Sequence, residues 1–274
     1  MPNVLTDQEV RAFDERGFVS PVKIISVDEA ADYRRKLEAY EAETGKSAVE
    51  TLHLKGHLYL DWAWRLARHP RLIGAVADIA GPDLFIMASR FWIKDPQDHK
   101  FVSWHQDHAY FGLKPPTIIT AWLALSEVTR HNGCMRLIPG SHRGGTFKHV
   151  EIDDKNNLLS RGQTLTNVDE NSAVDIVLKP GELSLHHGHV FHSSEPNLSD
   201  DRRIGFALMF IPAHVESTIG RRAATLVSGE DRYHYWDHDP EPTCDRDPVI
   251  WNLMHKAASH YYDRTHRQET ATAK

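Results

Sequence analysis

Two short stretches of the chain carry side chains that could bind one metal ion. His105 and Asp107 stand two positions apart in the first stretch, and His192 lies in the second. Successive side chains of a β-strand alternate between its faces, so a strand would turn His105 and Asp107 to the same side. With His192 on a neighbouring strand, two imidazoles and a carboxylate would hold one face of the ion and leave the other open. Non-haem Fe(II) oxygenases use this arrangement.

The spacing of His105 and Asp107 is by itself only weak evidence for a metal site. The chain contains 19 His and 38 acidic residues, and His149 with Glu151 repeats the pattern, as any surface strand could. The choice of the second metal histidine also needs an argument, because other histidines precede His192 in the same segment, namely His186, His187 and His189. Ser194 favours His192, since two positions further on it would face the same way along a strand.

The strand predicted after residue 202 contributes a cation. Large apolar residues alternate there with Arg203, Gly205, Ala207 and Met209. If this second set faces the interior, a buried guanidinium needs an anion. A dicarboxylate that chelates the metal at one end and pairs with Arg203 at the other would supply it, which describes 2-oxoglutarate. The alternative is that Arg203 lies on the surface in a basic turn.

Several blocks of the chain combine into one pattern. Residues 132–142 read NGCMRLIPGSH and residues 180–182 read PGE. The single residues of the pattern are His105 and Asp107, His192 followed by Ser194 and Asn197, and Arg203 eleven positions after His192. Together, over roughly residues 5–215, they resemble the phytanoyl-CoA dioxygenase family of Fe(II)/2-oxoglutarate oxygenases.

This resemblance implies roles for individual residues. His105, Asp107 and His192 would bind Fe(II), and Arg203 with Ser194 would bind the distal carboxylate of 2-oxoglutarate. Further positions would contact the cosubstrate or the substrate: Trp122, which could also be a plain core aromatic, and Lys94, Lys55 and Ser89. His186, His187 and His189 match no ligand position and would be structural or line the cavity.

The resemblance also implies a reaction. The enzyme would consume O2 and 2-oxoglutarate, release succinate and CO2, and hydroxylate an unactivated C–H bond. Asp107 fills the position that halogenating relatives leave free for halide, so hydroxylation is favoured over halogenation. Two alternatives stay open: a halogenase or another oxidative outcome, and a cupin-type protein that binds metal without being an enzyme.

The substrate is expected to be a small molecule of polar or anionic character. The candidate contacts near the cavity mouth are His108, Tyr110, Asn157 and Arg161, each of which could also belong to a solvated loop. A net charge of −6 and a pI near 6.3 argue against nucleic acid or an anionic membrane as a partner. The chain would act as a monomer or a homodimer.

The compartment follows from the cysteines and from the absence of targeting patterns. Cys134 and Cys244 form no disulfide framework and no Cys-x-x-Cys pair, which favours a reducing cytoplasm. No stretch approaches eighteen apolar residues, and no export signal is recognisable at the first residues. We therefore expect a cytoplasmic protein without a membrane span.

The elements that must position these residues suggest one oxygenase domain over 1–274. Residues 1–82 would be a mainly helical support. Capping boxes at Thr6 and Ser26 start helices that end at Gly17 and near Gly45, with an edge strand at 18–22 between them. Two further helices are expected over 59–68 and from Pro70 to the residue before the Gly81-Pro82 break.

The remaining chain predicts a mostly β fold with flanking helices and a double-stranded β-helix core of jelly-roll, cupin-like type. The core would span 83–215, with strands at 83–94, 102–107, 117–126, 134–139, 173–178, 182–187, 189–194 and 203–211. Residues 140–173 form a polar insertion, either a lid or disordered. Residues 216–264 would be a C-terminal cover with helical spacing from 247, and 265–274 a disordered tail.

Overall fold

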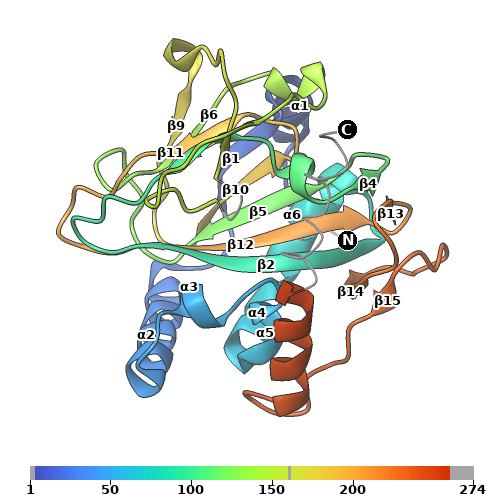
Figure 1. The fold of residues 1–274 in the computed structure, drawn as a ribbon. Coiled ribbons are helices and arrows are strands. Elements are labelled where there is room, and N and C mark those ends of the chain that lie inside the picture. Colours follow the sequence, from blue (N-terminus) through green and yellow to red (C-terminus); the bar gives the residue numbers. More distant parts are fainter. Residues whose placement is uncertain (1–3, 160–161, 260–274) are drawn as a thin grey trace.

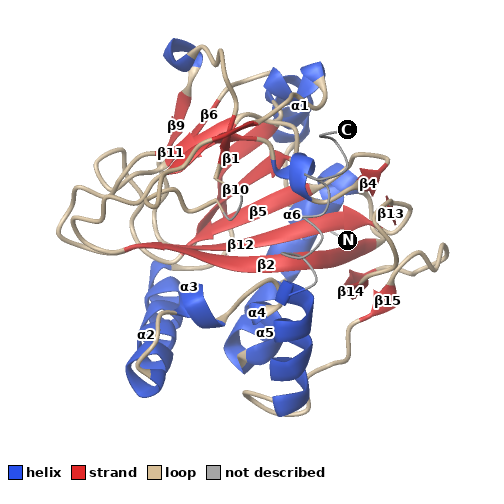
Figure 2. Ribbon diagram, viewed as in Figure 1, coloured by secondary structure: helices blue, strands red, loops and turns tan. Residues whose placement is uncertain are grey.

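The computed structural model describes residues 4–159 and 162–259. Its centre is a sheet of seven strands, and a second sheet of four strands packs over one face of it (Figure 1). Most helices lie against the other face of the large sheet (Figure 2). This arrangement confirms the predicted double-stranded β-helix core with flanking helices.

The helices precede the first long strand, as expected. They are α1 Asp7–Arg16, α2 Val27–Thr44, α3 Ala48–Thr51, α4 Gly56–Tyr59, α5 Asp61–Ala67 and α6 Pro70–Ala80. Both predicted capping boxes are present, with the Thr6 and Ser26 hydroxyls accepting from the N–H groups of Glu9 and Glu29. Gly17 and Gly45 end α1 and α2 in the left-handed conformation, which glycine adopts without strain.

The helix predicted over 59–68 is interrupted. α4 ends at Tyr59, and Leu60 is extended with φ −105° and ψ 122° before α5 begins. Distant backbone and side-chain groups supply the hydrogen bonds at this break: the Arg246 N–H donates to the Tyr59 carbonyl, and the Asp61 N–H donates to Asp245. Local sequence does not reveal partners that arrive from nearly two hundred residues away.

The large sheet has the strand order β1-β10-β5-β12-β2-β14-β15. Its strands are β1 Phe18–Lys23, β2 Leu84–Lys94, β5 Ile119–Ala124, β10 Glu182–His187, β12 Arg203–Pro212, β14 Ala223–Ser228 and β15 Asp237–His238. Its neighbouring strands run antiparallel except for the pair β14 and β15. The strand after α1 lies at an edge, as predicted.

The smaller sheet has the order β3-β11-β6-β9, from strands β3 Val102–His105, β6 Met135–Leu137, β9 Val174–Ile176 and β11 His192–Ser194. All four strands are shorter than predicted, and two of the differences concern the candidate ligands. The strand expected over 102–107 ends at His105, and Asp107 opens the 3-10 helix η1 (Asp107–Tyr110). The strand expected over 189–194 begins only at His192.

The polar segment 140–173 contains short elements where it is described. These are η2 Ser141–Gly144, η3 Glu170–Ser172 and the paired strands β7 Val150–Glu151 and β8 Gln163–Thr164. β4 Leu113–Lys114 and β13 Glu216–Ser217 form another short pair, which the sequence did not predict, nor did it predict β14 and β15. A last helix covers 248–259 as far as it is described, and the predicted tail at 265–274 lies outside the described residues.

The two faces of the large sheet bury different side chains. On β12, Ile204, Phe206, Leu208 and Phe210 join the core that the helices complete. Ala207 joins the core between the two sheets, on the face that Arg203 shares. The predicted alternation is therefore confirmed, with Arg203 directed between the sheets. Within the described ranges, no helix combines the length and apolar character that crossing a membrane requires.

Candidate metal centre

The three predicted metal ligands meet between the two sheets. His105 and His192 are paired across the antiparallel strands β3 and β11. Their Nε2 atoms each lie 3.6 Å from Oδ1 of Asp107, and the three donor atoms all lie within 4.8 Å of one another. Ligands that bind one ion at about 2.1 Å are roughly 3 to 3.5 Å apart, so this set fits a divalent metal after small shifts.

The backbone sets the tautomer of both histidines. Nδ1 of His105 donates to the carbonyls of Ser103 (2.9 Å) and His192 (3.1 Å), and Nδ1 of His192 donates to the carbonyl of Val190 (3.0 Å). Carbonyls only accept, so each Nδ1 carries a proton, and Nε2 of each ring is the nitrogen that faces Asp107. Burial and the neighbouring His105 hold the pKa of His192 well below its usual value. A neutral imidazole is the form that binds metal.

Asp107 reaches the centre although it lies outside β3. Gln106 keeps extended backbone angles (φ −122°, ψ 129°), so the alternation of the strand continues through this residue to Asp107. The Gln106 amide is held on the opposite side, where it donates to the carbonyls of Gly145 and His189. The predicted same-side geometry is therefore present, while the predicted strand bounds were wrong.

The two oxygens of Asp107 have separate surroundings. Oδ1 faces His105 and His192, whereas Oδ2 accepts a 2.5 Å hydrogen bond from the Thr120 hydroxyl and lies 3.4 Å from Nε2 of His186. Burial by itself would raise the pKa of Asp107, but the surrounding imidazoles outweigh it and hold the pKa well below the usual value. Asp107 is thus a carboxylate that presents one oxygen to the metal position.

The three histidines that precede His192 have different surroundings in the structure. His186 is buried in β10 next to Thr120 of β5, and it lines the same small cavity as the three candidate ligands. His187 and His189 instead contact each other and His108 or His142. Burial lowers the pKa of both His187 and His189 to about 4. The sequence did not indicate which of the three would reach the centre.

The other His-x-acid pair, His149 with Glu151, has a different environment. His149 accepts a hydrogen bond from the Gln106 backbone N–H through Nε2 at 3.1 Å, and it packs against the ring of Tyr110. Glu151 is exposed on β7. Within the described ranges this pair belongs to no three-ligand group, and His149 instead supports the loop around Gln106.

Two buried basic side chains lie side by side, and one of them, Arg203, lines the cavity. Arg203 and Lys94 face each other across β12 and β2. Arg203 donates to the carbonyl of Gly133 (2.7 Å) and, at 3.4 Å, to the Ser194 hydroxyl, and its guanidinium lies 5.4 Å from the Trp122 ring. Lys94 donates to the Ser194 hydroxyl at 2.5 Å and to the carbonyls of Ser194 and Glu195.

These cations fit an anionic ligand. Among the described residues, their hydrogen bonds go to neutral oxygens, and the buried Nε of Arg203 has no partner. Burial lowers the pKa of Arg203 to about 10, and burial together with Arg203 lowers the pKa of Lys94 to about 6. A carboxylate placed here would supply the charge that the protein does not.

The predicted substrate contacts are dispersed. Tyr110 lines a small cavity that also contains His105 and Asp107. His108 packs edge-on against His189, with ring centres 4.6 Å apart. Asn157 donates to the Ser103 hydroxyl at 2.9 Å and so attaches the insertion to β3. Arg161 lies outside the described residues.

Lys55 and Ser89 do not face the metal centre. Ser89 is five positions from Lys94 on β2, so their side chains point to opposite faces. The Ser89 hydroxyl bonds to Nδ1 of the buried His57 at 2.8 Å on the helical side. Lys55 forms a buried 2.6 Å ion pair with Asp239. Neither side chain reaches the metal centre, so their expected contact with cosubstrate or substrate stays a prediction. Thr120 and His186 do reach the centre, and of these two only His186 was expected to be structural or to line the cavity.

Comparison with known proteins gives the family that the sequence resembles. A model described as phytanoyl-CoA dioxygenase (PhyH) matches residues 1–205. A curated relative from Stutzerimonas stutzeri, a probable alpha-ketoglutarate-dependent hypophosphite dioxygenase, is 30% identical over 157 residues, which cover 55% of this chain and 54% of that protein. The chain therefore spans about half the length of this curated relative.

Solved structures agree over more of the chain. The apo structure of ThoJ, a non-heme monooxygenase, is 30% identical with a TM-score of 0.84, covering 96% of this chain and 99% of that one. CytC3 with Fe(II) and alpha-ketoglutarate is 24% identical with a TM-score of 0.62 over 85% of this chain and 92% of that one, a likeness that shows the fold. With the family model matching well over half of the residues, the chain belongs to the phytanoyl-CoA dioxygenase family of Fe(II)/2-oxoglutarate-dependent oxygenases.

Proposed function

We propose that the protein hydroxylates an unactivated C–H bond of a small polar or anionic metabolite, using Fe(II), 2-oxoglutarate and O2. His105, Asp107 and His192 would hold the metal. Arg203, Ser194 and Lys94 would hold the distal carboxylate of 2-oxoglutarate, with Trp122 packed beside it. One observation carries the proposal: two imidazole nitrogens and one carboxylate oxygen converge in a cavity that Arg203 also lines, and the hydrogen bonds of the buried Arg203 and Lys94 go to neutral oxygens among the described residues.

The residues around the centre suit this role. Fe(II), when bound, supplies oxidation of the substrate by O2 coupled to decarboxylation of 2-oxoglutarate to succinate and CO2. Nδ1 of each histidine is held by backbone carbonyls, which leaves Nε2 as the nitrogen available to the metal. Trp92, Met135 and Met209 give the cavity apolar walls that limit water near the reacting atoms. Asp107 fills the position that halide would need, which favours hydroxylation.

The test is succinate formation by the purified protein supplied with Fe(II), 2-oxoglutarate and O2. We expect Asp107→Ala and His192→Ala to reduce it by about a hundredfold or more, because each removes a ligand. The matched control is Glu151→Ala, which changes the acid of the other His-x-acid pair and should retain the wild-type rate. An Asp107→Ala protein with full turnover in the absence of chloride would contradict the proposal.

The substrate class is tested separately. Candidate substrates are added one at a time, from a panel of amino acids, phosphonates, carrier-bound acids and amines, and the increase in O2 consumption is measured. The mass of each product is then determined by mass spectrometry. A gain of one oxygen atom supports hydroxylation, whereas a chloride-dependent mass indicates halogenation. Iron binding without any consumption of 2-oxoglutarate would indicate a metal-binding protein that is not an enzyme.

A further inference from the structure

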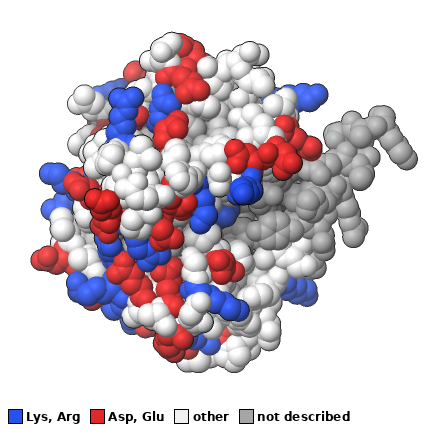
Figure 3. All heavy atoms as spheres, turned by 60° about the vertical axis from the view of Figure 1, so that its left-hand side comes forward, with Lys and Arg blue, Asp and Glu red and all other residues white. Residues whose placement is uncertain are grey.

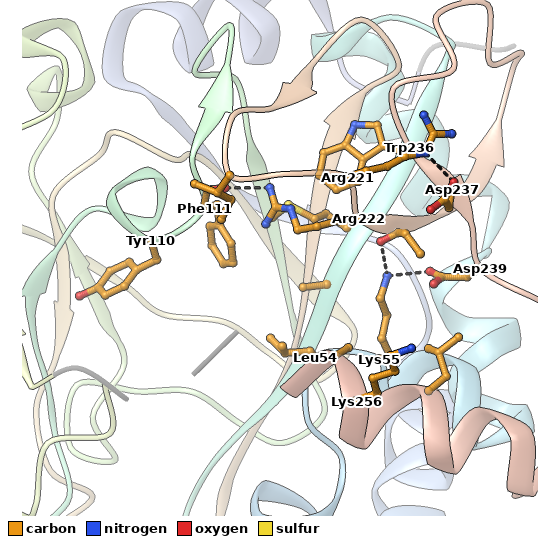
Figure 4. A pocket seen from close by; sticks show the side chains of 16 residues that line it. Leu54, Lys55, Tyr110, Phe111, Arg221, Arg222, Trp236, Asp237, Asp239 and Lys256 are labelled. Carbon is orange, nitrogen blue, oxygen red and sulfur yellow. Dashed lines mark hydrogen bonds and ion pairs between the residues drawn. The ribbon is translucent and has the colours of Figure 1, made fainter. Parts of the chain in front are cut away.

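The structure contains a chamber of about 350 Å³, whose wall residues are drawn in Figure 4. Its walls come from segments far apart in the chain: the residues before α4, the middle of β2, the end of η1, the β14 and β15 region, and the helix at 248–259. No residue of the β14, β15 and C-terminal part of this wall was predicted as a functional residue from the sequence.

The chamber adjoins a smaller cavity at the metal centre, and the two share wall residues. Leu54, Tyr110 and Phe111 line both the chamber and a smaller cavity of about 60 Å³. That smaller cavity also contains His105 and Asp107. In Figure 4, Tyr110 lies on the side of the chamber away from Lys55, with Phe111 between them. The three shared residues are therefore all that separates a molecule in the chamber from the cavity that contains His105 and Asp107.

The wall of the chamber is mainly apolar. Its apolar residues include Leu54, Met87, Ala88, Trp236, Leu253 and Ala257. Ligand pockets of roughly 300 to 1,000 Å³ bind most of a small organic molecule, and apolar walls select an apolar body of matching size. A wholly polar metabolite would lose its hydration along these apolar residues without receiving hydrogen bonds from them.

The charged residues of the chamber are mostly cationic. The wall contains four basic residues, namely Lys55, Arg221, Arg222 and Lys256. Its described acidic residues are Asp237 and Asp239. Lys55 is neutralised by Asp239 at 2.6 Å, and Arg221 by Asp237 at 2.7 Å. Lys256 is exposed at the edge of the chamber on the helix at 248–259, and it forms no ion pair with another described residue. The edge therefore favours an acidic group.

We propose that the chamber binds the body of the primary substrate, and that this substrate is amphipathic, with an apolar body and a carboxylate or phosphate near Lys256. The acidic group would lie at the edge, the body along Leu253, Ala257 and Trp236, and the carbon to be oxidised beyond Tyr110. This proposal rests on the proposed function and narrows its substrate from a polar molecule to an amphipathic acid.

The test uses three probes with ten-carbon chains: decanoate, decyl phosphate and decyltrimethylammonium. Each is titrated calorimetrically into the Fe(II)- and 2-oxoglutarate-loaded protein without O2. We expect saturable binding of at least one anion, about tenfold or more tighter than the cation. Ala257→Trp fills the chamber and should abolish this binding. Leu253→Trp fills it from one helical turn earlier and serves if the first variant does not fold.

Two charge variants complete the test. Lys256→Glu should weaken anion binding and strengthen binding of the ammonium probe, whereas Lys179→Glu, a change at an exposed lysine outside the chamber wall, should alter neither. The control Val249→Trp, on the same helix but exposed and outside the wall, should bind like the wild type. Equal affinity for all three probes, no binding of any, or binding that survives both chamber-filling variants would overturn the proposal.

Binding of 2-oxoglutarate to each variant is measured in parallel. If the wild-type protein does not bind 2-oxoglutarate in the presence of metal, the proposed function itself fails. If 2-oxoglutarate binds normally in all variants while the probes ignore the chamber substitutions, only the chamber proposal fails. Folding is checked by circular dichroism, so that lost binding is not attributed to an unfolded variant.

Discussion

The carboxylate of Asp107 is held by its non-metal oxygen. Thr120 donates to Oδ2, and His186 lies on the same side, so rotation of the carboxylate is restricted and Oδ1 stays directed at both histidines. Groups that orient metal ligands typically affect metal affinity by about 10- to 100-fold. Thr120 and His186 are neighbours across β5 and β10, which makes this support a property of the large sheet.

Replacing Thr120 by valine keeps the shape of the side chain and removes the donor. We expect Thr120→Val to bind Mn(II) about tenfold more weakly, because Oδ2 loses its hydrogen bond and Asp107 can turn away. Calorimetric titration of Mn(II) measures the affinity directly. The control is Thr166→Val at an exposed position, and equal affinity in both variants would contradict this account.

Lys94 makes the stability of the ligand-free protein depend on pH. Burial and the neighbouring Arg203 lower the pKa of Lys94 to about 6. In the unfolded chain a lysine has a pKa of about 10.4, so between these values the unfolded chain binds a proton that the folded protein lacks. The free energy of unfolding therefore rises with pH across this window and falls as pH drops toward about 6.

The variant Lys94→Met isolates this effect. Between about pH 7 and 8.5, we expect the free energy of unfolding to rise less steeply than in the wild type, by about 1.4 kcal/mol per pH unit at most. Urea unfolding at several pH values, without metal or 2-oxoglutarate, gives the two slopes. Parallel slopes would show that Lys94 is protonated in the folded protein.

At the scale of elements, a residue without a side chain on β12 makes room for an aromatic ring from the neighbouring strand β5. A Cβ at Gly205 would lie 1.8 Å from Cζ2 of Trp122. The Trp122 ring in turn lies beside the Arg203 guanidinium. Glycine in β12 thus allows the indole to lie flat over the inner face of the sheet, next to the cations proposed to bind 2-oxoglutarate.

Gly205→Ala should therefore displace Trp122. We expect a loss of about 1 to 3 kcal/mol in unfolding free energy from overpacking, together with weaker binding of 2-oxoglutarate. The comparison is Gly45→Ala, where φ is +64° and no atom lies within 4 Å of the added Cβ. That change should cost about 1 kcal/mol through backbone strain and leave 2-oxoglutarate binding unaltered. Normal 2-oxoglutarate binding by Gly205→Ala would count against the role of Trp122.

At the scale of the molecule, ion pairs join the N-terminal helices to the C-terminal region. Lys55, just before α4, is paired with Asp239, just after β15, and both side chains are buried. Arg246 and Glu43 form a second pair, at 2.5 Å, in which the Glu43 side chain is 63% exposed. Elsewhere, basic and acidic side chains are interspersed over the face drawn in Figure 3. Only the buried pair is expected to matter greatly for stability.

Asp239→Ala should destabilise the protein by about 3 to 5 kcal/mol, because it leaves the ammonium group of Lys55 buried without its partner. Glu43→Ala should cost no more than about 1 kcal/mol, because water solvates the exposed Arg246 pair. Denaturant midpoints of both variants test the difference. Similar losses of stability in Asp239→Ala and Glu43→Ala would contradict the view that the buried ion pair contributes more than the exposed one.

The sequence by itself determined much of the local structure and the candidate centre. Capping boxes at Thr6 and Ser26 depend on residues three apart, and the strand faces of His105, Asp107 and Arg203 depend on alternation within a few residues. Such short-range rules leave a direct pattern in the chain. For the same reason, the two alternating faces of β12 were recognisable in the sequence, while which of them points inward was left open until the fold was known.

Only the tertiary structure decided which further groups surround the centre. The break at Leu60 depends on Arg246 and Asp245, the support of Asp107 on Thr120 and His186, and the chamber on walls from five separate parts of the chain. Lys55 and Ser89 likewise face away from the metal position only because of how their segments pack. These contacts join residues that are distant in sequence, so no local periodicity records them, and the free energy that selects them comes from burying surfaces together.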